Sequence, residues 1–159
     1  MRRFFALITL ALAAPAAAYA VDAGVGDGTL EISSATGTIS IAVRGALIGR
    51  IDKGSVTLDD PDPTDGKAPV VWGFESRRDL TDTKSRYAGS DIRFRVIGGF
   101  FRARITGTGM NLSIVGKGSV TIAPNSSGLA AGTYSLNGDP ETPLPSFLTT
   151  LQLGAPTTP

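Results

Sequence analysis

Apolar and polar residues alternate along the chain from residue 29 onward. In the stretches 29–33, 38–44 and 55–59, apolar residues occupy every second position, and Gly, Ser, Thr, Asn and Asp cluster between the stretches. A period of two is typical of short antiparallel strands that bury one face. No convincing helical repeat follows residue 20. We therefore expect an all-β fold, an antiparallel barrel or sandwich of about eight to ten short strands.

The two halves of the patterned region share a short motif. Residues 53–58 read Lys-Gly-Ser-Val-Thr-Leu, and residues 117–122 read Lys-Gly-Ser-Val-Thr-Ile. We interpret this as an internal duplication, with halves at 29–75 and 91–136, inside a single β-domain at 29–138. Each half would end in a strand, at 70–75 and 132–136. Trp72 occupies a period-two position in the first of these strands, which predicts that it lies in the core.

The first twenty residues predict an export signal. Two arginines follow Met1, an apolar run covers 4–14, and Ala18-Tyr19-Ala20 supplies the small residues that a signal peptidase requires. The run is shorter than the ~20 residues that a membrane-spanning helix needs. We expect a cleavable signal at 1–20 and a flexible lead-in at 21–28. The product would be an extracellular or cell-envelope protein, soluble after cleavage, with no membrane span.

Removal of this signal would change the net charge. The sequence has 15 Lys and Arg against 14 Asp and Glu, and Arg2 and Arg3 would leave with the signal, so 13 basic and 14 acidic residues would remain. A chain with slightly more acidic than basic residues has no general attraction to nucleic acid. We expect no nucleic-acid partner.

The last residues, 139–159, differ in composition from the rest of the chain. They hold five prolines and show no alternation of apolar and polar positions. Such a segment cannot form a regular strand pattern of its own. We expect a Pro-rich tail that is partly disordered.

The most specific local feature is an arginine-rich stretch at 91–105. Gly98-Gly99 stands between two alternating runs, which predicts a two-residue hairpin turn because both glycines tolerate positive φ. In that register one face is apolar. The other face carries Arg93, Arg95, Arg102 and Arg104, with Arg95 opposite Arg102 and Arg93 opposite Arg104.

Like charges that face each other destabilise a sheet by about 0.2–1 kcal/mol per pair. Four arginines on one face therefore suggest an anionic counterpart. The counterpart would be an external ligand, such as an acidic glycan, a phosphate or another envelope component, which guanidinium groups bind well. Alternatively it would be internal, from Glu31, Glu75, Asp79 or the acidic loop, or it would come from a protein partner.

The acidic loop at 59–66 is a weaker candidate for a site. Asp60, Asp62 and Asp65 could surround a calcium ion, which binds oxygen ligands in flexible geometry. The spacing is not that of an EF-hand, and the two prolines of the loop alone account for a rigid turn. We expect no cofactor, with calcium as the alternative.

The composition also bears on catalysis. The chain has no Cys and no His, which excludes thiol nucleophiles, His-based triads and His metal sites. Lys53 with Ser55, and Lys117 with Ser119, have the residue types of a Ser-Lys pair. Their recurrence in both halves favours a structural turn instead. No pair of carboxylates suggests an acid and a base, so we expect no enzyme and rank a carboxylate or Ser-Lys hydrolase last.

Residues 87–138 resemble a group of small exported bacterial β-domain proteins of uncharacterised role. The resemblance rests on Gly, Arg and aromatic positions, for example Tyr-Ala-Gly-Ser-Asp-Ile-Arg-Phe-Arg from residue 87 and Gly-Thr-Tyr-Ser from residue 132. It implies a bacterial, exported β-domain and no particular activity. Our first interpretation is a non-catalytic exported domain that binds an anionic ligand through the arginine face. The second is a structural or accessory envelope domain whose arginine face pairs internally or with a protein.

Overall fold

The structure is a computed structural model that describes residues 26–63, 67–124 and 131–154, and this part of the chain forms antiparallel strands and no helix. Two strands are very long: β1 spans Gly28–Asp59 and β4 spans Lys84–Ala123. Five strands are short: β2 (Val70–Trp72), β3 (Ser76–Asp79), β5 (Ala131–Leu136), β6 (Thr142–Pro143) and β7 (Thr149–Leu153). The all-β antiparallel fold is confirmed. The expected eight to ten short strands are replaced by segments of two long strands that bend without ending.

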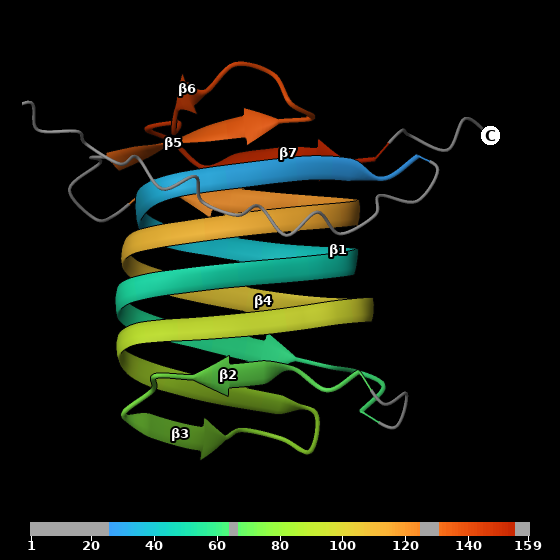
Figure 1. Ribbon diagram of the computed structural model, residues 1–159, viewed down its shortest axis with the longest axis vertical. Coiled ribbons are helices and arrows are strands. Elements are labelled where there is room, and N and C mark those ends of the chain that lie inside the picture. The colour runs from blue at the N-terminus through green and yellow to red at the C-terminus, as the bar shows by residue number, and fades with distance from the viewer. Residues whose placement is uncertain (1–25, 64–66, 125–130, 155–159) are drawn as a thin grey trace, which may run out of the picture.

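β1 and β4 wind together into a flattened spiral (Figure 1). Ile41 of β1 faces Ala103 of β4 on one side and Val120 of β4 on the other. Ala103 in turn also faces Leu58 of β1, so one turn of β1 runs from Ile41 to Leu58. The two strands therefore alternate along the long axis of the molecule, in a front layer and a back layer. The sheet does not close on itself, and its order is β2-β4-β1-β5-β6, with β3 and β7 also paired to β4.

The alternation of apolar and polar residues stabilises the spiral path of β1 and β4. Every second residue of β1 and β4 is buried over most of their length, so each strand keeps one face inward through its bends. The predicted inward face of the arginine-rich stretch is confirmed, because it is buried at Ile92, Phe94, Val96, Phe101, Ala103 and Ile105. Among the described residues no polar or charged side chain is buried in the core. Burial of apolar surface contributes about 25 cal/mol per Å². It is thus the main contribution that stabilises the wound arrangement of β1 and β4.

The predicted hairpin at Gly98-Gly99 is wrong. β4 continues through both glycines, whose φ angles are +78° and +73°. Between the facing pairs Arg44–Phe100 and Ala46–Ile97, β1 has one residue and β4 has these two glycines. Two residues opposite one make a β-bulge, which bends a strand without reversing it. The bend carries β4 from the front layer of Figure 1 to the back layer.

Short strands cover the two ends of the winding (Figure 1). β2 and β3 pair with the first half of β4, and β5, β6 and β7 lie at the opposite end. The Pro-rich tail supplies β6 and β7 and buries Leu144 and Leu153. The β-domain therefore continues past residue 138. The predicted signal at 1–20 and the end of the tail at 155–159 lie outside the described residues.

Trp72 is not in the core, contrary to the sequence prediction. It faces Arg93 of β4, on the outward side, and is 46% exposed. Val71 faces Phe94 and packs against the core instead. Because the register places Val71 inward, alternation along β2 turns its neighbours Val70 and Trp72 outward.

The two Lys-Gly-Ser-Val-Thr segments lie in similar surroundings. Gly54 has a φ of +153° and Gly118 has a φ of +146°. A Cβ atom at Gly54 would lie 2.1 Å from the carbonyl oxygen of Thr106, and one at Gly118 would lie 2.1 Å from that of Ala42. Neighbouring turns of the spiral therefore approach too closely for a side chain at either glycine. The internal duplication of 29–75 and 91–136 stays a prediction.

Gly54→Ala tests this close approach. We expect it to lower the free energy of unfolding by more than the about 1–3 kcal/mol that an unfavourable φ alone costs, because the Cβ also meets Thr106. Chemical denaturation measures the loss. Gly138→Ala is the control, since Gly138 has a φ of +80° but nothing within 4 Å of the added Cβ. Equal losses in the two variants would show that the approach of the strands is not limiting.

Candidate functional site

The four candidate arginines of β4 lie in two pairs on different layers. Arg93, Arg95, Arg102 and Arg104 are all exposed, as the alternation predicts. The bulge at Gly98-Gly99 separates the pairs, so 93–95 runs in the front layer and 102–104 in the back layer (Figure 1). β2 and β1 flank the first pair, whereas β1 flanks the second on both sides. The expected pairing of Arg95 with Arg102 and of Arg93 with Arg104 does not occur, and the predicted single patch is divided.

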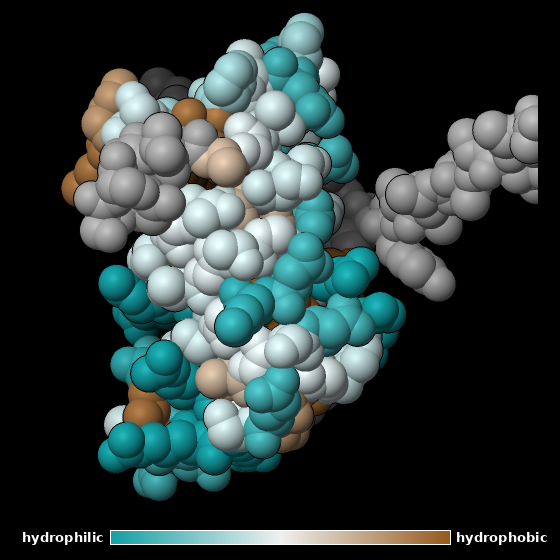
Figure 2. All heavy atoms as spheres, turned by 90° about the vertical axis from the view of Figure 1, so that its left-hand side faces the viewer, coloured by the Kyte–Doolittle hydropathy of each residue, from teal (hydrophilic) through white to brown (hydrophobic). Residues whose placement is uncertain are grey.

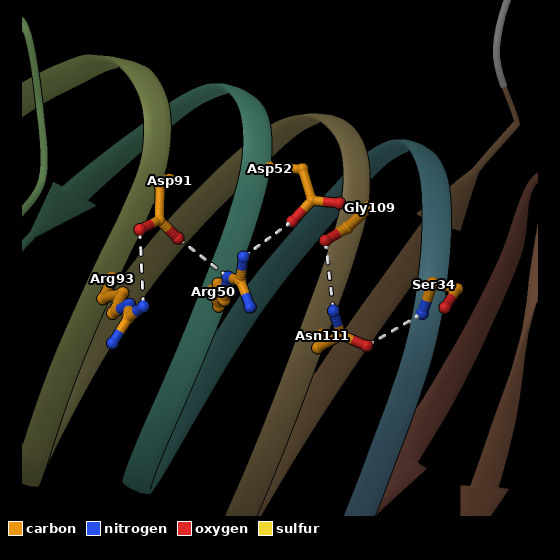
Figure 3. Close-up of polar contacts among 7 residues, drawn as sticks. All are labelled: Ser34, Arg50, Asp52, Asp91, Arg93, Gly109 and Asn111. Atoms are coloured by element: carbon orange, nitrogen blue, oxygen red, sulfur yellow. Dashed lines mark hydrogen bonds and ion pairs between the residues drawn. The ribbon is translucent and has the colours of Figure 1, made fainter.

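Arg93 belongs to an internal network at a bend of the spiral (Figure 3). It faces Arg50 of β1, and Asp91 lies between the two guanidinium groups. The Nε of Arg50 donates to Asp91 over 2.8 Å, and the Nη2 of Arg93 donates to the same carboxylate over 3.3 Å. Asp52 lies 3.5 Å from Arg50. This like-charged pair therefore has its counter-charge within the chain.

The partner of Arg93 is not one of the carboxylates that we expected. Glu75 accepts hydrogen bonds from the amide and the hydroxyl of Ser90. Asp79 pairs with Arg77, and Glu31 is exposed on β1. Asp91 lies two positions before Arg93, and alternation alone places both side chains on one face of β4, so the sequence did carry a signal for this partner.

Neighbouring bends along the same edge of the spiral carry a second set of polar contacts (Figure 3). The side-chain amide of Asn111 donates to the carbonyl of Gly109 over 3.2 Å, and its oxygen accepts from the amide of Ser34 over 3.1 Å. Ser34 and Asp91 have φ angles of +55° and +53°. Short polar side chains tolerate this left-handed conformation with local hydrogen bonds. These contacts hold the bends, so we assign Arg93 to the scaffold.

Arg95 has no charged residue directly opposite it on the neighbouring strands. It faces Ile48 of β1 and Val70 of β2, and it forms no ion pair within the described part of the chain. These two facing residues are partly exposed and apolar, so neither can bind an anion together with Arg95.

The second arginine pair borders a groove on the outer face of the back layer. The groove has a volume of about 350 Å³ and lies over β1 and β4. Its lining combines the hydroxyl side chains of Ser40, Thr57, Ser119 and Thr121 with the charged side chains of Asp59, Lys84, Arg102 and Arg104. One row of facing residues crosses it in the order Ser119, Ala42, Arg102, Asp59 and Lys84. The small residues at one end of the row, Ser119 and Ala42, leave the hollow.

The groove holds three cations and one carboxylate. Asp59, whose side chain is 15% exposed, lies 3.4 Å from the Nζ of Lys84 and 4.0 Å from the Nη1 of Arg102. It also accepts a hydrogen bond from the hydroxyl of Thr83 over 3.0 Å. Arg102 stacks over the ring of Phe100, with 4.9 Å from its Cζ to the ring centroid. This contact orients the guanidinium group through a cation–π interaction.

Arg104 is the least compensated cation of the groove. It forms no ion pair among the residues that the structure describes. Its neighbours across the sheet are Ser40 and Thr57, whose hydroxyl groups are neutral. A basic surface with neutral hydroxyl donors around it suits an oxyanion, which accepts hydrogen bonds from both kinds of group.

Asp79 and Ser85 hold β3 against β4. The hydroxyl of Ser85 and the Nε of Arg77 both donate to Asp79, and these hydrogen bonds lower the pKa of that carboxyl, the bond from Ser85 most. The hydrogen bond to Asp79, and then the proximity of Tyr87, raise the pKa of Arg77. A lowered folded-state pKa contributes stability above the unfolded pKa, and this stability is lost as the pH falls through the folded pKa. β3 should therefore loosen at acidic pH.

The structure describes two of the three candidate calcium ligands, Asp60 and Asp62, in one turn. The amide of Asp62 donates to the side chain of Asp60 over 3.2 Å, which is an Asx turn. Asp65 lies outside the described residues. No group of three or more Asp, Glu, His or Cys residues that could hold a metal occurs in the part of the chain that is described.

The two Ser-Lys pairs are directed to other partners. Ser55 accepts a hydrogen bond from Arg86 over 3.3 Å, and Lys117 lies 3.9 Å from Asp27. Ser119 lines the groove as a hydroxyl group and faces Ala42 and Gln152 on the neighbouring strands. These contacts match the structural interpretation of the motif.

Sequence reasoning missed most of the groove. Its residues come from five separate stretches of the chain, around 40–42, 57–59, 84, 102–104 and 119–121. The winding alone makes them neighbours. The sequence marked Asp59 as a candidate site residue, because it begins the acidic turn. Nothing in the sequence marked Lys84 or the hydroxyl residues in this way.

Comparisons with protein-family models, with curated proteins and with solved structures found no match for this chain. Within the described residues, no helix has the length and apolar character needed to cross a membrane. The candidate site therefore rests on geometry and charge. Figure 2 looks onto the bends at the left of Figure 1 and shows hydrophilic side chains gathered toward the end that carries β2 and β3.

Asp91→Asn tests the scaffold role of the Arg93 network. We expect it to lower the free energy of unfolding by up to about 1 kcal/mol, because two half-exposed ion pairs are lost while Asn keeps the left-handed backbone. The loss should shrink in high salt. Asp52→Asn is the control, since Asp52 pairs with Arg50 alone at 3.5 Å. A greater loss from Asp52→Asn would contradict the assignment.

Ser85→Ala tests the cause of the Asp79 shift. Without the hydroxyl donor, the pKa of Asp79 should rise toward its ordinary value, because the charged carboxylate loses its strongest hydrogen bond. A pH titration followed by NMR of the side-chain carboxyl carbon measures it. Ser90→Ala, which removes a hydroxyl from Glu75 instead, is the control and should leave Asp79 unchanged. An unchanged Asp79 in Ser85→Ala would reject this cause.

Proposed function

We propose that this protein is an exported, non-catalytic β-domain that binds an anionic ligand in the groove of Lys84, Arg102 and Arg104. The observation that carries the proposal is the excess of positive charge in this groove. Three cationic side chains and four hydroxyl groups line a volume of about 350 Å³ together with a single carboxylate. Guanidinium groups bind carboxylates, sulfates and phosphates through paired N–H donors. Neutral hydroxyl groups add donors without adding charge.

The location of the groove supports the proposal as well. Its arginines project from a long strand that is paired on both sides by β1, so their backbone is held rigidly. Sites on rigid strands keep their geometry better than sites on loops. Asp59 pairs weakly with Arg102 and more closely with Lys84, so an incoming anion would compete with a single carboxylate.

The export signal and the bacterial resemblance fit a role at or outside the cell envelope, where acidic glycans and phosphates are exposed. A structural or accessory envelope domain is the second candidate. It is favoured by Arg93, whose charge is neutralised within the chain. That network accounts for one of the four arginines and leaves Arg102 and Arg104 to the ligand.

Inorganic sulfate and inorganic phosphate are the first probes. Added at constant ionic strength and at low concentration, where the general stabilising effect of these salts is small, they should raise the melting temperature of the protein over that in chloride, because a ligand that binds the folded state stabilises it. Arg102→Gln with Arg104→Gln should weaken binding at least tenfold, as two charge-assisted contacts worth about 1.5–3 kcal/mol each are replaced. Isothermal titration calorimetry measures the affinity directly.

Two matched variants make the test specific. Arg95→Gln removes another exposed arginine of the same strand and should leave binding unchanged. Asp59→Asn removes the competing carboxylate and should tighten binding. The proposal fails if Arg102→Gln with Arg104→Gln binds sulfate as well as the unmodified protein, or if Arg95→Gln weakens binding equally.

A further inference from the structure

The basic surface continues beyond the groove onto β3. Thr57 of β1 faces Arg104 on one side and Arg86 of β4 on the other. Arg86 in turn faces Arg78 of β3. Facing residues on neighbouring strands point to the same side of a sheet. The outward row therefore runs Arg104, Thr57, Arg86, Arg78, next to the row that holds Arg102, Asp59 and Lys84.

These two rows define a basic strip, which consists of Arg78, Lys84, Arg86, Arg102 and Arg104. Neighbouring strands lie about 4.8 Å apart, and residues two positions apart on a strand are separated by about 6.7 Å. Three strand spacings thus separate the Cα positions of Arg104 and Arg78, a span of about 14 Å. A single sulfate or phosphate reaches only a part of such a strip.

Arg78 and Arg86 are a second like-charged pair that face each other directly. In the first pair, Arg50 and Arg93, the carboxylate of Asp91 lies between the guanidinium groups. No such carboxylate joins Arg78 and Arg86 among the described residues.

The contacts of Arg78 and Arg86 do not neutralise their positive charges. Arg86 donates to the neutral hydroxyl of Ser55, and Asp79, beside Arg78 in sequence, pairs with Arg77. Asp79 faces Ser85, on the side of the sheet opposite to Arg78. The chain therefore neutralises one opposed pair and leaves the other for an external negative charge.

The strip also favours one class of polyanion. The lining of its groove end is hydroxyl-rich, and no aromatic residue belongs to that lining. Single-stranded nucleic acids are usually bound with aromatic side chains that stack on the bases. Ser, Thr and Arg side chains instead match the hydroxyl and acidic groups of a sugar chain.

We propose that the basic strip binds an acidic polysaccharide, with the chain laid across β1, β4 and β3 from the groove toward Arg78. This inference rests on the proposed function, because the groove is one end of the strip. Successive acidic groups of the polymer contact Arg102 and Arg104 in the groove and Arg86 and Arg78 outside it. Affinity for the polymer thus depends on chain length, and affinity for a small anion does not depend on Arg78 or Arg86.

The test compares probes of increasing length on the purified protein. The probes are inorganic sulfate, oligouronates of two to twelve sugars, dextran sulfate, neutral dextran and oligothymidylate. Calorimetry should show affinity that rises at least tenfold from the disaccharide to a chain that spans the strip and then levels off, with no binding of neutral dextran. The oligouronates and dextran sulfate distinguish carboxylate from sulfate as the preferred acidic group.

The variants separate the strip from the groove. Arg78→Gln with Arg86→Gln should weaken binding of the long oligouronate at least tenfold and leave inorganic sulfate binding unchanged. Arg102→Gln with Arg104→Gln should weaken both. Arg95→Gln is the control for loss of an exposed arginine, and Arg86→Lys, which keeps the charge, should retain most of the polymer affinity. Circular dichroism before each titration confirms that each variant is folded.

Different failures have different meanings. If sulfate binds in the groove but longer oligouronates bind no more tightly, or if Arg78→Gln with Arg86→Gln has no effect on them, the inference is overturned and the proposed function stands. If oligothymidylate binds more tightly than an oligouronate with the same number of charges, the polysaccharide assignment is overturned. If no anion binds, the proposed function and the inference both fail.

Discussion

The structure depends on one constraint: β1 and β4 must keep a single apolar face inward through every bend of the spiral. A one-residue slip in a strand would turn its buried residues outward, so register is fixed wherever one face is buried. The bulge at Gly98-Gly99 satisfies this constraint, because Phe94 and Phe101 on its two sides are both buried. The polar contacts of Asp91 and Asn111, at two other bends, hold the turns together on the outside. The buried core and the bends together arrange successive turns of β1 and β4 as the two layers of one domain.

This winding creates the candidate site. An outer face built from successive turns of two strands brings together residues that are far apart in the chain, such as Ser40, Lys84 and Arg102. Small residues at Ser40, Ala42 and Ser119 make the hollow, and longer charged residues border it. The same geometry separates residues that are near one another in sequence. Arg95 and Arg102 share a strand but not a surface, because the bulge sends them to different layers.

The sequence predicted what depends on local alternation. The all-β class, the inward face at 92–105 and the exposure of the four arginines all follow from a period of two. It could not predict whether the chain reverses or continues at Gly98-Gly99. Gly-Gly is compatible with a hairpin turn and with a bulge, and the pairing with the partner strand decides between them. The outward position of Trp72 follows from the register of β2 against β4, in which Trp72 faces Arg93, and no local pattern reveals that register. The groove was out of reach for the same reason, since its lining is decided by which turns of the spiral become neighbours.

The most direct test of the account is an NMR titration of the labelled protein with inorganic sulfate. Backbone amide shifts should change together in five separate stretches, 40–42, 57–59, 84, 102–104 and 119–121, because the winding brings them to one groove. That result would support the spiral and the site at once. Shift changes centred on 93–95, or spread evenly over all exposed arginines, would contradict the account.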